Sequence, residues 1–302
     1  MHKALMIFNP KSNHGRSWQT VADMRAIVDT LGGADWRGTE FPGHAAEIAA
    51  AAQGYDTVIG LGGDGTIHEV VNGLMQIPVE VRPALGVVPV GSGNDFAFAL
   101  GVSLEQPLEA VRAAMTASPR QVDIGRITDG AGRFEYFTNT CGIGFDAAIN
   151  IRTRKITWAH GFAMYLAATL QSIAMHFDGA LMKVSYDDGG FELPTLMVIV
   201  ANGSREGGGF MVAPDARIDD GIFEFVYVGQ VSRPRMLQLM TKFMNGTHVR
   251  EPDVHMRRTT RLRLESNRAI PIHLDGELFA PYEANVRVVE VEMLPGALKV
   301  RV

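Results

Sequence analysis

The sequence predicts two domains of different class, an N-terminal doubly wound α/β domain and a C-terminal antiparallel β-sandwich or barrel. Length is the first reason, because 302 residues allow two domains that each bury a core. The second is a change of pattern near residue 126, where buried strands alternating with amphipathic helices give way to a series of strands with period-two alternation. We therefore expect domains at 1–126 and 127–302.

Apolar runs and helical periodicity alternate through the first domain. Three apolar runs, each followed by glycine or asparagine, read as buried parallel strands: 4–8, 57–61 and 84–90. The spacing of apolar residues elsewhere predicts helices at 18–31, 45–52 and 67–74. In such a sheet the ligand lies beyond the carboxyl ends of the strands, so the loops after these runs are the first candidates for a binding site.

Period-two alternation dominates the second domain. It predicts strands at 181–186, 196–201, 222–228, 261–265, 270–274, 286–293 and 298–302. Two helical segments interrupt them, at 158–177 and 232–245. Polar residues such as His160, Gln171 and His176 make the first of these unsuitable for a membrane span, so we expect a packed helix and no transmembrane segment.

Charge and cysteine content exclude several classes of protein. A net charge of -5 argues against a dedicated nucleic-acid binder, which needs a basic face to neutralise phosphates. Cys141 is the single cysteine, so an intrachain disulfide and a multi-cysteine metal site are excluded, and we expect it to be a small buried residue of a strand. The N-terminus reads as a strand rather than a signal peptide, and together these features predict a cytoplasmic protein.

The sharpest motif is Gly62-Gly63-Asp64-Gly65-Thr66, between a strand and a helix that we expect to begin near Ile67. Glycines at such a turn let the backbone approach a phosphate, and the amides of the helix start attract the anion. Thr66 and Glu69 have the spacing of a capping box. The carboxylate of Asp64 would repel a bare phosphate, which indicates Mg²⁺ handling or proton transfer. The match to a dinucleotide fingerprint is weak, and the P-loop lysine is missing.

A second glycine loop, Gly91-Ser92-Gly93-Asn94-Asp95, follows the strand 84–90. Its glycines allow another close approach of backbone to ligand, and Asn94-Asp95 would cap the next helix. Because both loops follow parallel strands, they should lie at the same edge of the sheet. Together they predict a single nucleotide-binding crevice.

These motifs, with Asn9-Pro10, Asn72-Gly73 and Asp275-Gly276-Glu277, resemble the diacylglycerol kinase catalytic family. This family includes bacterial diacylglycerol-kinase-like lipid kinases and is related to sphingosine and ceramide kinases. The segments 139–147 (NTCGIGFDA) and 207–224 (GGGFMVAPDARIDDGIFE) extend the likeness over almost the whole chain. The resemblance implies a nucleotide domain and a β-sandwich around a cleft, with a final strand, 298–302, that returns to the first domain.

The resemblance also implies an activity, the transfer of the γ-phosphate of Mg-ATP to a hydroxyl of a lipid such as diacylglycerol, phosphatidylglycerol or a sphingoid base. The lipid would be presented at a membrane surface, so we expect a cytoplasmic protein that can act peripherally at the inner membrane face. Nucleic acid is not an expected partner, and a homodimer is compatible with the sequence. Two alternatives stay open, a NAD kinase or other GGDGT-type small-molecule kinase, and a non-catalytic lipid or nucleotide sensor.

Site residues follow from the resemblance and from the two loops. The residues expected to bind ATP are Asn9, Thr39, Gly62, Gly63, Asp64, Gly65, Thr66, Ile67, His68, Glu69, Gly91, Ser92, Gly93 and Asn94. A structural cation is implied at the Asp220 carboxylate and the carbonyls of Arg217 and Ile222. Mg²⁺ would bridge the phosphates to Asp64 and Asp95. Glu277 is the implied general base, and Asp64 is its rival, because related sphingosine kinases give that role to the acid of GGDGT.

Three further features bear on the lipid. Phe98 stands where the family commonly has an arginine, which puts the head group or its affinity in question. Apolar residues of 158–177 either line an acyl pocket or pack in the core. Five arginines either face an anionic bilayer or form the solvent face of a strand: Arg257, Arg258, Arg261, Arg263 and Arg268.

Overall fold

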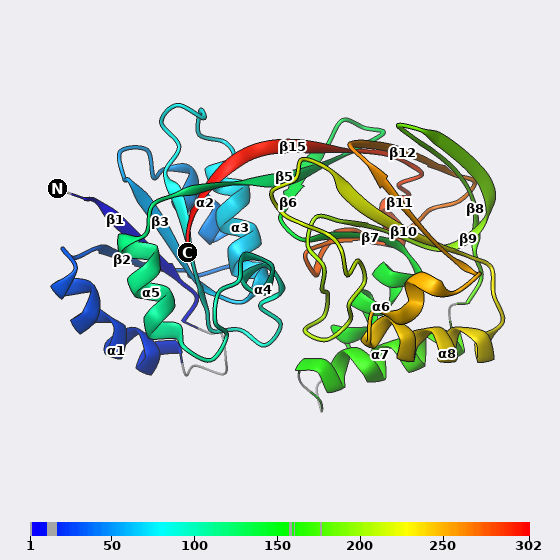
Figure 1. Cartoon of the computed structure of the whole chain (residues 1–302), viewed down its shortest axis with the longest axis horizontal. Helices are drawn as coiled ribbons and strands as arrows, with labels where there is room; N and C mark the ends of the chain where they lie inside the picture. Colours follow the sequence, from blue (N-terminus) through cyan, green and yellow to red (C-terminus); the bar gives the residue numbers. More distant parts are fainter. Residues whose placement is uncertain (1, 11–16, 157–158, 160, 176) are drawn as a thin grey trace. The chain divides into compact units, whose positions relative to one another are not determined.

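The computed structural model describes residues 2–10, 17–156, 159, 161–175 and 177–302 (Figure 1). The chain divides into two compact units, Met1–Ile124 with Pro295–Val302, and Gly125–Leu294. This division lies close to the boundary predicted at residue 126, and the end of the chain belongs to the first unit. Among the described residues, no helix combines the length and the apolar character that a membrane crossing needs.

The first unit is built on a parallel sheet with the strand order β15-β4-β3-β1-β2. The bounds of its strands are β1 (Ala4–Phe8), β2 (Asp35–Gly38), β3 (Thr57–Gly62), β4 (Ala84–Pro89) and the end of β15 (Val288–Arg301). Every residue of β1, β3 and β4 is buried, which explains their uninterrupted apolar sequences. The edge strand β2 is partly exposed and has no apolar run, so periodicity did not predict it.

Helices cover both faces of this sheet, which confirms the predicted doubly wound α/β class. Their bounds are α1 (Ser17–Thr30), α2 (His44–Ala50), α3 (Asp64–Leu74), α4 (Asp95–Leu100) and α5 (Pro107–Thr116). Side chains of α1 and α5 share a core with Ile59 on one face. On the opposite face, a Cβ added to Gly60 would lie 2.6 Å from the side chain of Ile67 in α3, so glycine allows that helix to pack closely.

The last strand is longer than predicted. Two strands were expected, at 286–293 and 298–302, but β15 continues from the one range into the other as one strand. Its first part pairs antiparallel with β12 (Arg261–Ser266), and Val300 pairs in parallel with Leu85 of β4. The amide of Gly296 (φ 58°) donates to Asp123 Oδ1 at 2.7 Å, so a buried side chain replaces a strand partner at this position.

The second unit is an antiparallel sandwich with added helices, as predicted. Its strands are the second half of β5 (Arg120–Asp129), β6 (Phe134–Phe137), β7 (Thr140–Gly144), β8 (Ala180–Tyr186), β9 (Gly189–Ala201), β10 (Phe223–Gly229), β11 (Val254–Thr259), β12, β13 (Ile272–Leu274), β14 (Glu277–Ala280) and most of β15. Its helices are α6 (Phe145–Thr153), α7 (Gly161–Met175) and α8 (Arg233–Met244), with short 3-10 turns at Thr247–Arg250 and Tyr282–Ala284. Cys141 is fully buried in β7, as expected.

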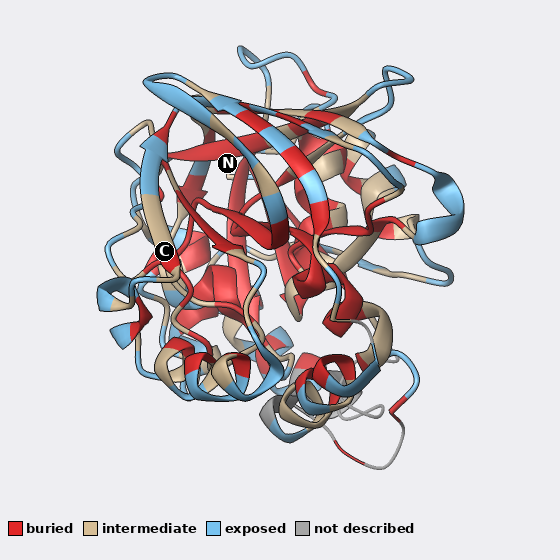
Figure 2. Cartoon of the chain, turned by 90° about the vertical axis from the view of Figure 1, so that its right-hand side faces the viewer, coloured by how far each residue is buried: buried red, intermediate tan, exposed pale blue. Residues whose placement is uncertain are grey.

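Alternation along the strands separates two apolar cores in this unit. In β9, Val198 and Val200 face the interior of the sandwich, while Met197 and Ile199 face the helices. The strands β8 and β12 alternate between buried and exposed residues, which Figure 2 shows as changes of colour along the ribbon. The second core lies under α6, α7 and α8. Helix α6 was not predicted, because its short sequence has only a weak apolar stripe.

The five arginines named above belong largely to the solvent face. Arg258 pairs with Asp220 at 2.7 Å, and Arg261 and Arg263 both pair with Glu290. Arg268 pairs with Asp178. Ion pairs between exposed side chains favour the interpretation as a solvent face over that of a bilayer-facing patch.

Candidate functional site

The two glycine loops of the first unit lie against each other at the carboxyl edge of the parallel sheet. The first follows β3 and the second follows β4, which are adjacent and parallel. The amides of Asp95 and Phe96 donate to Asp64 Oδ1 at 2.7 and 3.3 Å. The Asp64 carboxylate therefore joins the first glycine loop to the start of α4, the helix that follows the second loop.

Glycine is required where the loops touch. A Cβ on Gly91 would lie 2.3 Å from the Cα of Gly63 and 2.9 Å from its nitrogen. Both neighbours are backbone atoms, which cannot rotate away, so any side chain at this position would separate the loops. The sequence predicted a close approach of backbone to ligand; the structure adds a close approach of backbone to backbone.

The position of Asp64 answers a question that the sequence raised. A carboxylate beside a phosphate loop is unfavourable unless something offsets its charge. Here two amides at the start of α4 supply part of that compensation without a cation. Its expected contact with Mg²⁺ stays a prediction.

The predicted capping box at Thr66 and Glu69 is wrong. Helix α3 begins at Asp64. Its N-cap residue is Gly63, which has no side chain to accept a capping hydrogen bond. The Glu69 carboxylate instead accepts from the amides of Gly43 at 2.8 Å and Ala45 at 3.1 Å, at the start of α2. Thr66 and Glu69 have the spacing of a capping box, but the Glu69 carboxylate binds the start of α2 instead.

The predicted cap at Asn94 is also corrected. Asn94 occupies the N-cap position of α4 in a left-handed conformation (φ 54°), but it makes no capping bond. Its side chain closes the loop on itself, accepting from the amide of Gly91 and donating to its carbonyl. The cap of α4 comes from Asp64, which lies 31 residues away in sequence.

The remaining ATP candidates lie at the same edge or in the first turns of α3. The amide of Thr39 donates to the carbonyl of Phe8 at 2.9 Å, which brings Thr39 beside the start of the loop at Asn9. The first helical hydrogen bond of α3 runs from Ile67 to Gly63, so the amides of Gly65 and Thr66 have no partner within the helix. The other residues expected to bind ATP are Gly62, His68, which is buried, Ser92, which is exposed, and Gly93. Phe98, which stands where the family commonly has an arginine, is exposed on α4.

The candidate cation turn belongs to the second unit. Asp220 Oδ2 accepts from Arg258 at 2.7 Å, and its Oδ1 accepts from the amide of Ile222 at 3.3 Å. Carboxylate and carbonyl oxygens are suitable ligands for a hard cation, so the residue types at Arg217, Asp220 and Ile222 fit one. A cation bound there would share the Asp220 carboxylate with Arg258.

Glu277 begins β14 directly after a tight turn. Asp275 and Gly276 both have positive φ, 51° and 86°, the pattern of a two-residue hairpin for which Asp-Gly is favoured. The Asp275 carboxylate is buried and accepts four hydrogen bonds of 2.8 to 3.1 Å from Thr138, Asn139 and Thr140. Asp275 is therefore structural, while the partly exposed Glu277 carboxylate pairs with Arg154 at 2.9 Å.

A buried polar cluster in the second unit was missed by the sequence analysis. His273 Nε2 lies 2.8 Å from Asp146 Oδ2 and 3.1 Å from Glu206 Oε1. The hydroxyl of Tyr165 donates to Glu206 at 2.8 Å and lies 3.3 Å from Asp146. The one available signal was a histidine within an otherwise apolar strand, since the other members come from α6, α7 and a loop.

A proton on His273 offsets part of the negative charge in this cluster. Burial lowers the pKa of His273, but Glu206 and Asp146 raise it more, to about 10. Burial, together with Asp146, raises the pKa of Glu206. The amide of Gly276 points at His273 Nδ1 from 3.3 Å, which would favour an unprotonated nitrogen. Two contacts to carboxylates outweigh that single weak bond, so the imidazole is charged at neutral pH.

The same cluster has the residue types of a metal site. One ligand atom each from Asp146, Glu206 and His273 lies within 4.8 Å of the others. A divalent cation would have to replace the imidazole proton, which already supplies the positive charge. The ion-paired form therefore accounts for the cluster without a metal.

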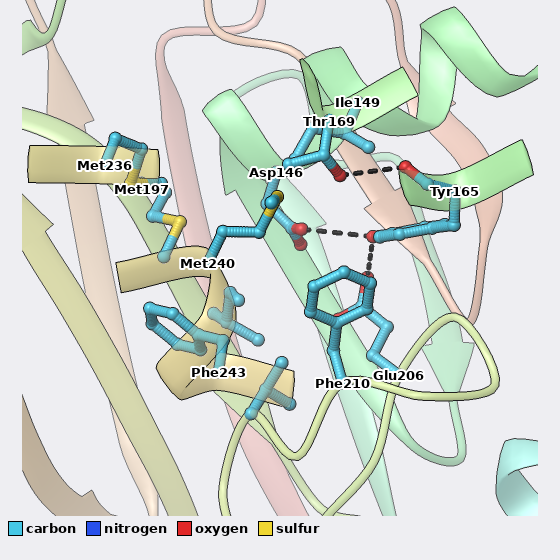
Figure 3. Close-up of a pocket in the computed structure, with 12 residues that line it drawn as sticks. Asp146, Ile149, Tyr165, Thr169, Met197, Glu206, Phe210, Met236, Met240 and Phe243 are labelled. Atoms are coloured by element: carbon cyan, nitrogen blue, oxygen red, sulfur yellow. Dashed lines mark hydrogen bonds between the residues drawn. The ribbon is translucent and has the colours of Figure 1, made fainter. Parts of the chain in front are cut away.

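An apolar pocket opens beside this cluster within the second unit (Figure 3). Its empty space, which includes open solvent at the mouth, is about 400 Å³, and Asp146, Tyr165 and Glu206 lie at one end. The rest of its wall is apolar apart from Thr169 and comes from α6, α7, α8, β9 and the loop 206–212: Ile149, Thr169, Met197, Ile199, Phe210, Val212, Met236, Met240 and Phe243. A ligand with an apolar chain and a hydroxyl group has the chemistry that such a lining accommodates.

Comparison with known proteins identifies the family. The diacylglycerol kinase catalytic domain matches residues 3–127, and the YegS C-terminal NAD kinase beta sandwich-like domain matches residues 139–302. The chain belongs to the diacylglycerol kinase family. The resemblance carried by the sequence motifs is thereby confirmed.

Relatives in this family match most of the length of this chain. The "Probable lipid kinase YegS-like" of Chromohalobacter salexigens is 35% identical over 253 residues, covering 82% of this chain and 76% of that protein. The diacylglycerol kinase of Bacillus subtilis is 28% identical over 282 residues, covering 92% and 90%. The crystal structure of a diacylglycerol kinase from Bacillus anthracis superimposes with a TM-score of 0.76 at 22% identity, covering 99% and 96% of the two chains, which shows a shared fold.

The His273 cluster predicts a specific pH dependence of stability. The pKa of His273 in the folded protein, about 10, lies above its ordinary 6.5, so the ion pairs contribute fully below pH 6.5 and are lost as the pH rises to 10. We expect the difference in unfolding free energy between wild type and His273→Gln to be largest below pH 6.5 and to shrink toward pH 10. Urea denaturation at a series of pH values measures this. A difference that stayed constant would contradict a charged His273.

Proposed function

We propose that this protein transfers the γ-phosphate of Mg-ATP to a hydroxyl of a lipid such as diacylglycerol, phosphatidylglycerol or a sphingoid base. Membership of the family supports a phosphotransferase reaction. The observation that supports a lipid as the acceptor is the pocket, which has an apolar wall and a polar end. A soluble acceptor such as NAD would have little use for a lining rich in methionine and phenylalanine.

The pocket supports an acceptor with both apolar and hydroxyl groups. Each methylene buried in it would contribute about 0.8 kcal/mol to binding. Among the described residues, the buried Oε2 of Glu206 has no hydrogen-bond partner. A hydroxyl other than the one that is phosphorylated, which phosphatidylglycerol and sphingoid bases carry, could donate to this oxygen, and the polar end would then orient the molecule while the apolar wall holds its chain.

For ATP, the first unit offers backbone amides rather than charged side chains. The amides of Gly65 and Thr66, at the start of α3, have no partner within the helix and would hold phosphate oxygens. Asp64 and Asp95 lie side by side at this edge and would hold Mg²⁺. The metal, when bound, would neutralise charge on the transferred phosphate.

Glu277 is the better candidate for the general base. The Asp64 carboxylate already accepts two backbone amides, which stabilise it as an anion and orient it for a structural role. Glu277 is partly exposed, and its contact with Arg154 keeps it at the surface of the second unit. In the proposed reaction, the oxygen of the lipid hydroxyl attacks the γ-phosphorus of ATP and ADP departs. Glu277 accepts the proton of that hydroxyl.

A labelled-phosphate assay tests this proposal. We expect γ-labelled ATP and Mg²⁺ to give a labelled product with a lipid panel containing diacylglycerol, phosphatidylglycerol and a sphingoid base, but no labelled product with NAD. Glu277→Gln should lower the rate about 10²- to 10⁴-fold, the usual worth of a general base. Labelled NAD phosphate would support the small-molecule kinase instead, and ATP binding without transfer to any lipid would support a sensor.

The contact between the loops gives an independent prediction. Gly91→Ala should weaken ATP binding about tenfold or more, because the added methyl group would push Gly63 away and separate Asp64 from Asp95. Isothermal titration calorimetry with ATP measures the effect. Gly130→Ala is the control, since the nearest atom to its Cβ would be 3.5 Å away. Equal affinities in the two variants would show that the loops need not touch.

A further inference from the structure

Helix α6 presents one polar side chain per turn to the hairpin that carries Glu277. Asp146 pairs with His273 at 2.8 Å, and the Asn150 amide donates to the carbonyl of Gly276 at 2.6 Å. Arg154, at the C-cap of the same helix, pairs with Glu277 at 2.9 Å. These three residues are four apart in sequence, a spacing that puts them on one side of a helix.

Hydrogen bonds of neighbouring residues fix the backbone at Glu277 independently of the Glu277 side chain. Asp275 receives four hydrogen bonds from the segment 138–140. The next carbonyl, that of Gly276, is held by Asn150, whose side chain is buried. The strand before the turn is held through His273. Only the side-chain torsions of Glu277 remain to be fixed.

Among the described residues, the Glu277 carboxylate pairs with Arg154. Its guanidinium donates through Nη2 to Glu277 Oε2, and the two side chains are 48% and 47% exposed. An ion pair with this exposure adds little to folding stability, typically 0 to about 1 kcal/mol. The contact is therefore poorly explained as a stabilising feature, although it restricts one carboxylate oxygen and leaves the other for a ligand.

We propose that Arg154 is a positioning residue that orients the Glu277 carboxylate toward the hydroxyl of the acceptor. This inference rests on the proposed function, because it assigns Arg154 to the reaction in which Glu277 is the base. A general base must lie within hydrogen-bond reach of the proton it removes, so loss of its orientation lowers turnover more than it lowers substrate affinity.

Steady-state kinetics of Arg154→Gln tests the proposal. We expect kcat with the lipid to fall about tenfold, with the KM for ATP and the thermal unfolding temperature unchanged. Arg154→Lys should recover part of the loss, because it retains a cation that can reach the carboxylate. Arg152→Gln is the matched control, since Arg152 lies on the same helix and contacts the sulfur of Met175 instead.

A double-mutant cycle separates positioning from a general effect of charge. If Arg154 acts through Glu277, Arg154→Gln should cause no further loss of kcat in a Glu277→Gln background. An additive loss would overturn the proposal, because Arg154 would then act on another group.

The outcomes distinguish this inference from the proposed function. Active wild-type enzyme with equal kcat in Arg154→Gln and Arg152→Gln would overturn the role of Arg154 and leave the lipid kinase activity standing. Wild-type enzyme that phosphorylates no lipid would overturn both. Full activity in Glu277→Gln would remove the base and, with it, the residue proposed to position that base.

Discussion

The carboxylate of Asp64 at the start of α4 is the interaction on which the first unit's site depends. It links two loops that are 31 residues apart in sequence, and the link is possible because Gly63 and Gly91 approach without side chains between them. Backbone amides and an acidic side chain are thereby brought to one edge of a parallel sheet. That edge is the place where such sheets bind their ligands, so the geometry and the topology lead to the same location.

The second unit solves a similar problem with buried acids. Asp275 is neutralised by four hydrogen bonds, whereas Asp146 and Glu206 share the proton carried by His273. Each arrangement fixes part of the hairpin before Glu277. Burying unpaired carboxylates would cost several kcal/mol, roughly the penalty per ion in a protein interior, so these partners are needed for the unit to fold as well as for the hairpin to be rigid.

Local patterns were reliable where one segment decides its own structure, and failed where distant groups compete. The apolar runs predicted the strands β1, β3 and β4. The capping box at Thr66 failed because Glu69 reaches the start of α2. The expected separation of the strands 286–293 and 298–302 was wrong, since β15 is continuous and Asp123 accepts from the amide of Gly296 within it.

The sequence by itself determined the two fold classes, the presence of two glycine loops and the family, since each depends on order and spacing along the chain. The tertiary structure alone decided the partners of His273, of Asn150 and of Glu277, and the pocket beside them. Three of these contacts, His273 with Asp146, Asn150 with Gly276 and Glu277 with Arg154, join residues more than 120 positions apart. No local period encodes them, because they depend on how α6 packs against β13 and β14 once the sandwich has formed.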